Sequence, residues 1–138
     1  MQVLYTATAT ATGDGRNGHT ASDDGIVDVD VRVPKEMGGP GGATNPEQLF
    51  AAGYAACFHS ALKVVGASEK ADVAGTEVSA TVSIASLDNG GFGLAVELDV
   101  HAPSLSHDAA LALVEKAHQV CPYSNATRGN IEVKLTVI

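Results

Sequence analysis

Two cysteines constrain this chain more than any other feature, because they lie far apart in the sequence. Cys57 and Cys121 are separated by 64 positions, and neither belongs to a Cys-x-x-Cys pair. Each lies inside or at the end of an apolar segment with the periodicity of a helix. If the two thiols act together, the fold must therefore bring two distant helical segments into contact.

The composition is that of a single acidic domain over residues 1–138, with 45% hydrophobic content. Aromatic residues make up only 4%, so the core must consist mostly of small aliphatic side chains. Each of these buries little area, and we expect an oligomer that adds buried surface. The net charge of −8 disfavours nucleic acid and anionic membrane surfaces as partners.

The N-terminal end and the low cysteine content favour a cytoplasmic location. No basic region followed by a continuous apolar run is visible at the start, so no signal peptide is expected. Two cysteines suit a reducing cytosol, where a disulfide is more often catalytic than structural. The apolar segment Leu49–Ala67 is interrupted by His59, Ser60 and Lys63, which favours a buried helix over a membrane span.

Hydrophobic patterning predicts an α+β fold. Alternation with a period of two predicts strands at residues 3–12, 26–33, 76–87, 92–101 and 131–138, with a turn-rich link at 123–130. A first helix is expected over residues 46–66, behind an Asn45 cap to which Gln48 can reach back. A second helix opens at a serine, 104 or 106, and stops at Pro122. This order indicates two helices against mostly antiparallel sheet.

A reactive Cys57 needs a positive charge from elsewhere in the fold. A free cysteine is more often a buried, inert side chain, and an apolar helix interior raises the thiol pKa. Cys57 lies about eleven residues past Pro46, where the helix dipole no longer helps. Arg16, in a glycine-rich turn, is the candidate cation, and Glu47 can orient it through a bidentate pair. A solvated turn arginine and an acid that complements the helix dipole are the plain alternatives.

The spacing of Glu47 and Cys57 limits how they can share a site. Ten residues of straight helix span about 15 Å, which one side chain cannot bridge. If both residues serve one site, the helix is bent or Glu47 comes from a neighbouring subunit. Two copies of the helix packed antiparallel would bring Glu47 of one near Cys57 of the other, which predicts a site shared across a homodimer.

Two motifs carry a resemblance to a known family. Residues 44–58 (TNPEQLFAAGYAACF) and 117–130 (AHQVCPYSNATRGN) look like the two signatures of the organic hydroperoxide resistance proteins, the Ohr branch of the Ohr/OsmC family. The opening YTATAT at 5–10, the turn around Arg16 and the GGFG run at 90–93 are similar too. The resemblance covers essentially the whole chain.

This resemblance implies a thiol peroxidase with an OsmC-like fold, a long central helix, a second helix and an intertwined homodimer. Cys57 matches the peroxidatic cysteine and Cys121 the resolving cysteine. Arg16 matches the arginine that activates the thiolate, and Glu47 the acid that holds this arginine. The implied substrate is an organic hydroperoxide. The implied reductant is external, dihydrolipoamide or a lipoylated protein, with no bound cofactor or metal.

The implied chemistry needs an apolar wall beside Cys57, to favour organic over hydrogen peroxide. The apolar residues available for it are Phe50, Phe58, Leu62 and Met37. Two rival interpretations remain open. The first is a zinc module, in which Cys57, His59, His118 and Cys121 supply two sulfurs and two nitrogens. His59, two residues from Cys57, points about 200° around the helix, which weakens this set. The second rival is a non-catalytic stress or binding protein with the same fold.

Overall fold

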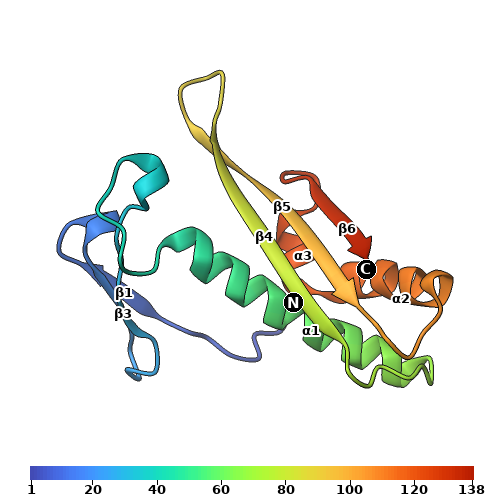
Figure 1. The fold of residues 1–138 in the computed structure, drawn as a ribbon. Helices are drawn as coiled ribbons and strands as arrows, with labels where there is room; N and C mark the ends of the chain where they lie inside the picture. Colours follow the sequence, from blue (N-terminus) through green and yellow to red (C-terminus); the bar gives the residue numbers. More distant parts are fainter. The chain divides into compact units, whose positions relative to one another are not determined.

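The computed structural model describes all 138 residues, and they form two compact units, residues 1–49 and 50–138 (Figure 1). Each unit contains one three-stranded sheet. The α+β class is confirmed, and the long helix α1, Pro46–Ser68, begins in the first unit and continues into the second. The single domain over residues 1–138 stays a prediction.

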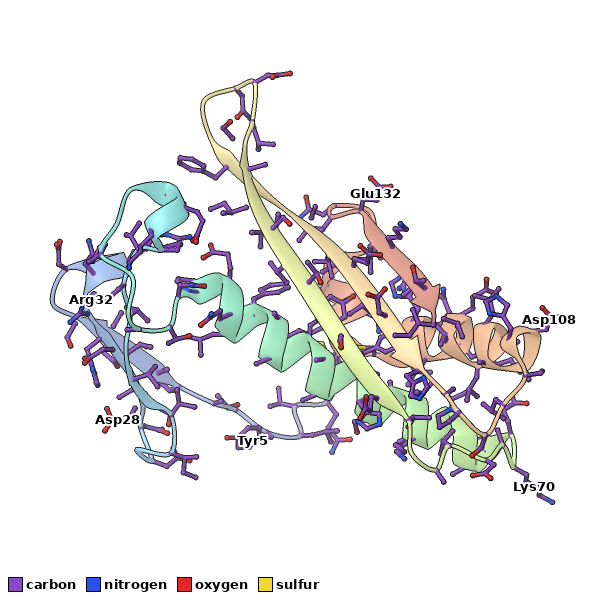
Figure 2. The ribbon with its side chains drawn as sticks, in the orientation of Figure 1. Tyr5, Asp28, Arg32, Lys70, Asp108 and Glu132 are labelled. Atoms are coloured by element: carbon purple, nitrogen blue, oxygen red, sulfur yellow. The ribbon has the colours of Figure 1, made fainter.

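The first unit is a small antiparallel sheet with the order β1–β2–β3. Its strands are β1 (Ala9–Thr12), β2 (His19–Ser22) and β3 (Asp28–Asp30). Two short 3-10 turns, Gly15–Asn17 and Lys35–Met37, complete it. The predicted strand 3–12 was too long: the stretch that carries Tyr5 (Figure 2) belongs to no strand of this chain.

Two further strand predictions in this unit need correction. The predicted strand 26–33 shortens to β3, although Val31 adds an isolated bridge to Thr44. β2 was missed, because its sequence, HTAS, has no apolar alternation to reveal it. Its register comes instead from pairing with both neighbours, since Thr20 lies opposite Ala11 on one side and Val29 on the other.

The second unit contains the predicted hairpin. β4 (Glu77–Ser86) and β5 (Phe92–His101) pair antiparallel over their full length, as the alternating sequences predicted. β6 (Val133–Val137) pairs parallel to β5. The register aligns Val82, Val96 and Val133 across the three strands, so one face of the sheet is apolar and contributes to the core.

Side-chain caps account for the beginnings of the long helices. The Asn45 Oδ1 accepts the Gln48 N–H at 2.8 Å, which confirms the predicted cap of α1. The Gln48 side chain does not reach back to that cap; its Oε1 accepts from the Thr44 hydroxyl at 2.8 Å. The Ser106 Oγ caps α2, His107–Val120, by accepting the Ala109 N–H at 3.2 Å.

A third helix replaces the predicted turn-rich link. α3, Pro122–Thr127, follows α2 after a single residue, Cys121. Pro122 does end α2, as expected, but it also opens α3, because a proline in the first helical turn loses no hydrogen bond. Cys121 therefore stands at a sharp junction between two helices.

The core of the second unit lies between α1, α2 and the apolar face of the sheet. Its most buried members are Tyr54, Phe58, Leu62, Leu98, Val100, Val114 and Cys121. α1 is long and apolar enough to cross a membrane by length and composition alone, a test that core helices also pass. Because Tyr54, Phe58 and Leu62 pack inside this core, α1 is a central helix of the unit.

Candidate functional site

The fold brings the two cysteines into contact. The Cys121 Sγ lies 3.6 Å from the Cys57 Sγ, and both are free thiols. Cys57 projects from the middle of α1 and is partly exposed, whereas Cys121 is fully buried at the α2–α3 junction. A disulfide needs a sulfur–sulfur distance of about 2.05 Å, so the bond requires an approach of about 1.5 Å.

The surroundings of Cys57 hold its thiol in the protonated form. Burial raises the pKa of Cys57, and the neighbouring Cys121 thiol raises it further. The backbone N–H of Tyr123 donates to the Cys57 sulfur and partly offsets this effect. None of the groups that shift this pKa is a positive side chain.

Arg16 and Glu47 form the predicted bidentate ion pair. The Arg16 Nη1 donates to the Glu47 Oε2 at 2.9 Å, and its Nη2 donates to Oε1 at 2.7 Å. This bonding lowers the pKa of Glu47 and raises that of Arg16, so both groups stay charged at neutral pH. The side chain of Glu47 is only 14% exposed and that of Arg16 is 39% exposed. Glu47 thus holds a guanidinium that still reaches solvent.

The turn that carries Arg16 is fixed by Arg32, a residue that the sequence did not single out. The Arg32 Nη1 donates to the carbonyls of Asn17 at 3.1 Å and Gly18 at 2.9 Å. The side-chain oxygen of Asn17 accepts the Val33 N–H at 2.9 Å. Arg32 alternates with aspartates in a strand-like run, so it looked like a solvated strand residue, and only the tertiary contact reveals its role.

Three aromatic rings cluster on α1 and α3, the helix that carries Cys57 and the helix that follows Cys121. The Tyr123 ring centroid lies 5.6 Å from that of Tyr54 and 6.1 Å from that of Phe50. A Cβ added at Gly53 would lie 3.0 Å from the Tyr123 hydroxyl oxygen, so the glycine lets this ring lie against α1. Tyr123 was missed because it was assigned to a link. The motif position directly after Cys121-Pro122 was the available signal.

Of the four residues proposed for an apolar wall beside Cys57, all except Phe50 are poorly placed for it. Phe58 and Leu62 are fully buried core residues, and a substrate arriving from solvent cannot reach them. Met37 lies in the first unit and is 44% exposed. Phe50, like Cys57, is partly buried and packs against the core of the second unit, and its ring centroid lies 6.1 Å from that of Tyr123.

The four side chains of the zinc interpretation do not converge. The His59 Nε2 lies 3.0 Å from the Thr76 hydroxyl, and the His118 Nδ1 lies 2.8 Å from the Ser124 hydroxyl. No group of three or more His, Cys, Asp or Glu side chains is arranged to hold a metal ion. The predicted site residues thus gather as two pairs, a thiol pair and an ion pair. Their catalytic roles stay predictions.

Comparison with known proteins places this architecture. Residues 39–136 match the family described as OsmC-like protein. An organic hydroperoxide resistance protein of Xanthomonas axonopodis pv. citri is 54% identical over 138 residues, which cover 99% of this chain and 96% of the relative. The chain belongs to the OsmC-like family, in the branch of the organic hydroperoxide resistance proteins.

Crystal structures of two relatives share the fold over nearly the whole chain. An organic hydroperoxide resistance protein from Elizabethkingia anophelis, with thiocyanate bound, has a TM-score of 0.94 and 59% identity, covering 99% of this chain and 98% of that one. A relative from Vibrio cholerae, with captopril in one of its active sites, has a TM-score of 0.93 and 48% identity, covering 99% and 94%. The OsmC-like fold predicted from the sequence is confirmed.

Proposed function

We propose that this protein is a cysteine-based peroxidase that reduces organic hydroperoxides to alcohols and so protects its cell against oxidative stress. The observation that carries the proposal is the contact of two free thiols, Cys57 and Cys121, at 3.6 Å. The name of the Xanthomonas relative, an organic hydroperoxide resistance protein, supports the substrate class. A dithiol that is partly open to solvent on one side suits a two-electron reduction.

In the first step, the Cys57 thiolate attacks the distal oxygen of the hydroperoxide. The O–O bond breaks, the alcohol leaves after taking up one proton, and Cys57 becomes a sulfenic acid. Phe50 and Tyr123 offer apolar contact to the organic part of the substrate. Hydrogen peroxide has no such part and gains nothing from these rings.

In the second step, the Cys121 thiol attacks the Cys57 sulfur. The S–S bond forms, and the sulfenic oxygen leaves as water with the thiol proton of Cys121. An external dithiol then reduces the disulfide by exchange and is itself oxidised to a disulfide. We assign this role to dihydrolipoamide or a lipoylated protein, in a cytoplasm whose reducing state keeps such dithiols available.

Arg16 supplies the positive charge that the thiol lacks within its own unit. Held by Glu47, the guanidinium lowers the Cys57 pKa and stabilises the charge that develops on the peroxide oxygens. Because Glu47 and Cys57 are about 15 Å apart along α1, the Arg16 of one subunit serves the Cys57 of its partner in a homodimer.

Exposed apolar side chains at the N-terminus support the homodimer. Val3, Leu4 and Tyr5 lie in the predicted strand 3–12 but belong to no strand of this chain. Leu4 is 90% exposed and Tyr5 is 80% exposed. Apolar groups gathered on such a segment are typical of a surface that a partner covers, and a second copy of the chain would bury them.

Single-cysteine variants test the proposal. Cys57→Ser should abolish turnover of an alkyl hydroperoxide, because an alkoxide-type nucleophile is not available at neutral pH. Cys121→Ser should consume about one equivalent of peroxide per chain and then stop, because the sulfenic acid has no resolving thiol. Steady-state turnover with dihydrolipoamide as reductant measures the first effect, and the amount of peroxide consumed by the reduced variant without added dithiol measures the second. Full turnover by Cys57→Ser would refute the mechanism.

A further inference from the structure

A group of polar side chains on α1, α2 and α3, three of them buried hydroxyls and the fourth a partly buried histidine, has no part in the mechanism above. The Tyr54 hydroxyl lies 2.8 Å from the Ser124 Oγ and 3.2 Å from the Thr127 Oγ1. The His118 Nδ1 lies 2.8 Å from the same Ser124 Oγ. We call these four residues the hydroxyl cluster. Ser124 is its centre, because it joins a side chain of α1 to a side chain of α2.

The spacing of the hydroxyl cluster matches that of the thiols. Tyr54 precedes Cys57 by three residues on α1, and Ser124 follows Cys121 by three residues across the start of α3. Residues three apart on a helix share a face. The hydrogen bond between Tyr54 and Ser124 and the contact between Cys57 and Cys121 therefore lie about one helical turn apart in the same junction.

One further bond holds the end of α3 against α2. The Arg128 Nη2 donates to the His118 carbonyl at 2.6 Å. Cys121 is the only residue between the two helices, so the position of its sulfur follows from how α3 docks. Ser124 contributes to this docking, because it is the only side chain of α3 bonded to side chains of both α1 and α2.

The burial of these groups indicates a specific purpose. Tyr54 and Ser124 are completely buried, and Thr127 is 3% exposed. A buried hydroxyl is tolerated only with a partner, and an apolar replacement of the whole group would fill the same space without that need. These polar groups lie one helical turn from a reacting pair. Their presence there is best explained by the precise position that directional hydrogen bonds give α3 relative to α1 and α2.

We propose that the hydrogen bond between Tyr54 and Ser124, supported by His118, positions Cys121 for disulfide formation with Cys57. This role rests on the proposed function, and the three residues act through Cys121 without touching the substrate. The bonds keep the sulfurs within a short approach of each other, so attack of the Cys121 thiol on the Cys57 sulfenic acid is faster than a second attack by peroxide. Loss of these bonds slows formation of the disulfide and leaves the oxidation of Cys57 by peroxide unchanged.

The first test measures closure without peroxide. The intact protein is equilibrated with mixtures of reduced and oxidised dithiothreitol, and its disulfide fraction gives the effective concentration of one thiol at the other. Tyr54→Phe and Ser124→Ala should each lower this concentration by about tenfold, since small misplacements of reacting groups have effects of this order or more. The double variant should lose little more than either single one, because both remove the same bond.

Thr76→Ala is the matched control. Thr76 is also a buried hydroxyl of residues 50–138, but its bonds run to His59 and to the Val73 carbonyl and not to α3. It should lose stability comparably while its effective thiol concentration stays within twofold of the unmodified chain. Equal losses in Thr76→Ala and Ser124→Ala would overturn the proposal, because the effect would then report general loosening of the unit.

The second test follows one turnover with an alkyl hydroperoxide. Ser124→Ala should oxidise Cys57 at the unmodified rate but accumulate sulfinic acid, seen by mass spectrometry, at lower peroxide concentrations. Unchanged closure and unchanged sulfinic acid in both variants would overturn the inference and leave the peroxidase intact. If the unmodified chain does not react with hydroperoxides, the proposed function fails, and the dithiothreitol equilibrium still decides whether the hydroxyl cluster positions Cys121.

Discussion

The ion pair of the first unit and the thiol pair of the second are built in opposite ways. Arg16 and Glu47 carry full charges, make two parallel hydrogen bonds and remain in reach of solvent. Cys57 and Cys121 lie in or beside an apolar core, and burial raises the pKa of Cys57. The first pair is charged, whereas the second holds two thiols in apolar surroundings.

Under the proposed function, this difference means that neither unit provides a reactive thiolate alone. A thiol buried among apolar groups is protected from adventitious metals and oxidants, but it is also unreactive at neutral pH. Under the proposed function, Arg16 of one subunit activates Cys57 of its partner, so reactivity would depend on assembly. The comparison therefore predicts that changes in the ion pair affect thiol ionisation, whereas changes around the thiol pair affect disulfide closure.

The largest effect in the ion pair is expected for Arg16→Lys. An ammonium keeps the charge but cannot make both bonds to Glu47, so it is not held in the same place. We expect kcat/KM for an alkyl hydroperoxide to fall by about a hundredfold, the typical effect of losing one preorganised donor. The rate of Cys57 alkylation against pH should show the cause, with its midpoint moved to higher pH because the thiolate is less favoured.

Mixing two inactive variants tests whether the charge acts between subunits. A dimer of one Arg16→Lys chain and one Cys57→Ser chain contains one site with both native residues, if the site is shared. After subunit exchange at equal amounts, about a quarter of the full activity should return. A mixture that stays inactive, although mass spectrometry shows mixed dimers, would place Arg16 and Cys57 in the same subunit.

Much of the second unit could be predicted from the sequence, because its signals are local. Strict alternation predicted β4 and β5. The identity of the site residues also came from motifs. The contact of Cys57 and Cys121 could not be derived from spacing, because it depends on α3. The sequence predicted only that Pro122 ends the preceding helix, not that it opens another.

The first unit was harder to predict because its elements are held by tertiary contacts. β2 has no apolar periodicity, and its place follows from pairing on both sides. Arg32 fixes the turn of Arg16 through backbone carbonyls, which carry no sequence signal. The N-terminal stretch around Tyr5 has strand periodicity without a strand partner, so the pattern predicted a strand there that this chain does not form.

A smaller effect is expected for Glu47→Gln. The amide retains the shape of the carboxylate but gives Arg16 only one acceptor and no charge, so the guanidinium becomes mobile while its own charge remains. We expect kcat/KM to fall by about tenfold, which corresponds to a rise of one unit in the Cys57 pKa. The equilibrium between the thiols and dithiothreitol should not change. A variant that altered closure more than ionisation would contradict the division between the two pairs.

The smallest effect concerns His19, which lies in the first unit away from the thiols in sequence. Its Nδ1 lies 2.8 Å from the Asp30 Oδ1, and its Nε2 lies 2.5 Å from the Asp28 Oδ1. The hydrogen bond to Asp30 is the largest cause that raises the pKa of His19, and the bond to Asp28 is the second. The bond between His19 and Asp30 also lowers the pKa of Asp30. All three groups are exposed, so the contribution to stability is small and screened by salt.

The stability that His19, Asp28 and Asp30 contribute depends on pH in a direction that can be derived from their pKa shifts. Because the folded pKa of His19 is raised, its contribution is complete below the ordinary value of 6.5 and is lost as pH rises through the folded pKa. The contribution of Asp30 is present above its ordinary value of 3.8 and is lost as pH falls through its lowered pKa. His19→Asn should therefore destabilise the chain at about pH 5.5 and have little effect at about pH 9, measured by urea unfolding at low salt.

His101→Asn, at an exposed histidine without an ion pair, is the control and should show no such difference. An equal loss at both pH values would mean that His19 stabilises β2 by packing, and the charge-based character of the first unit would then end at Arg16 and Glu47.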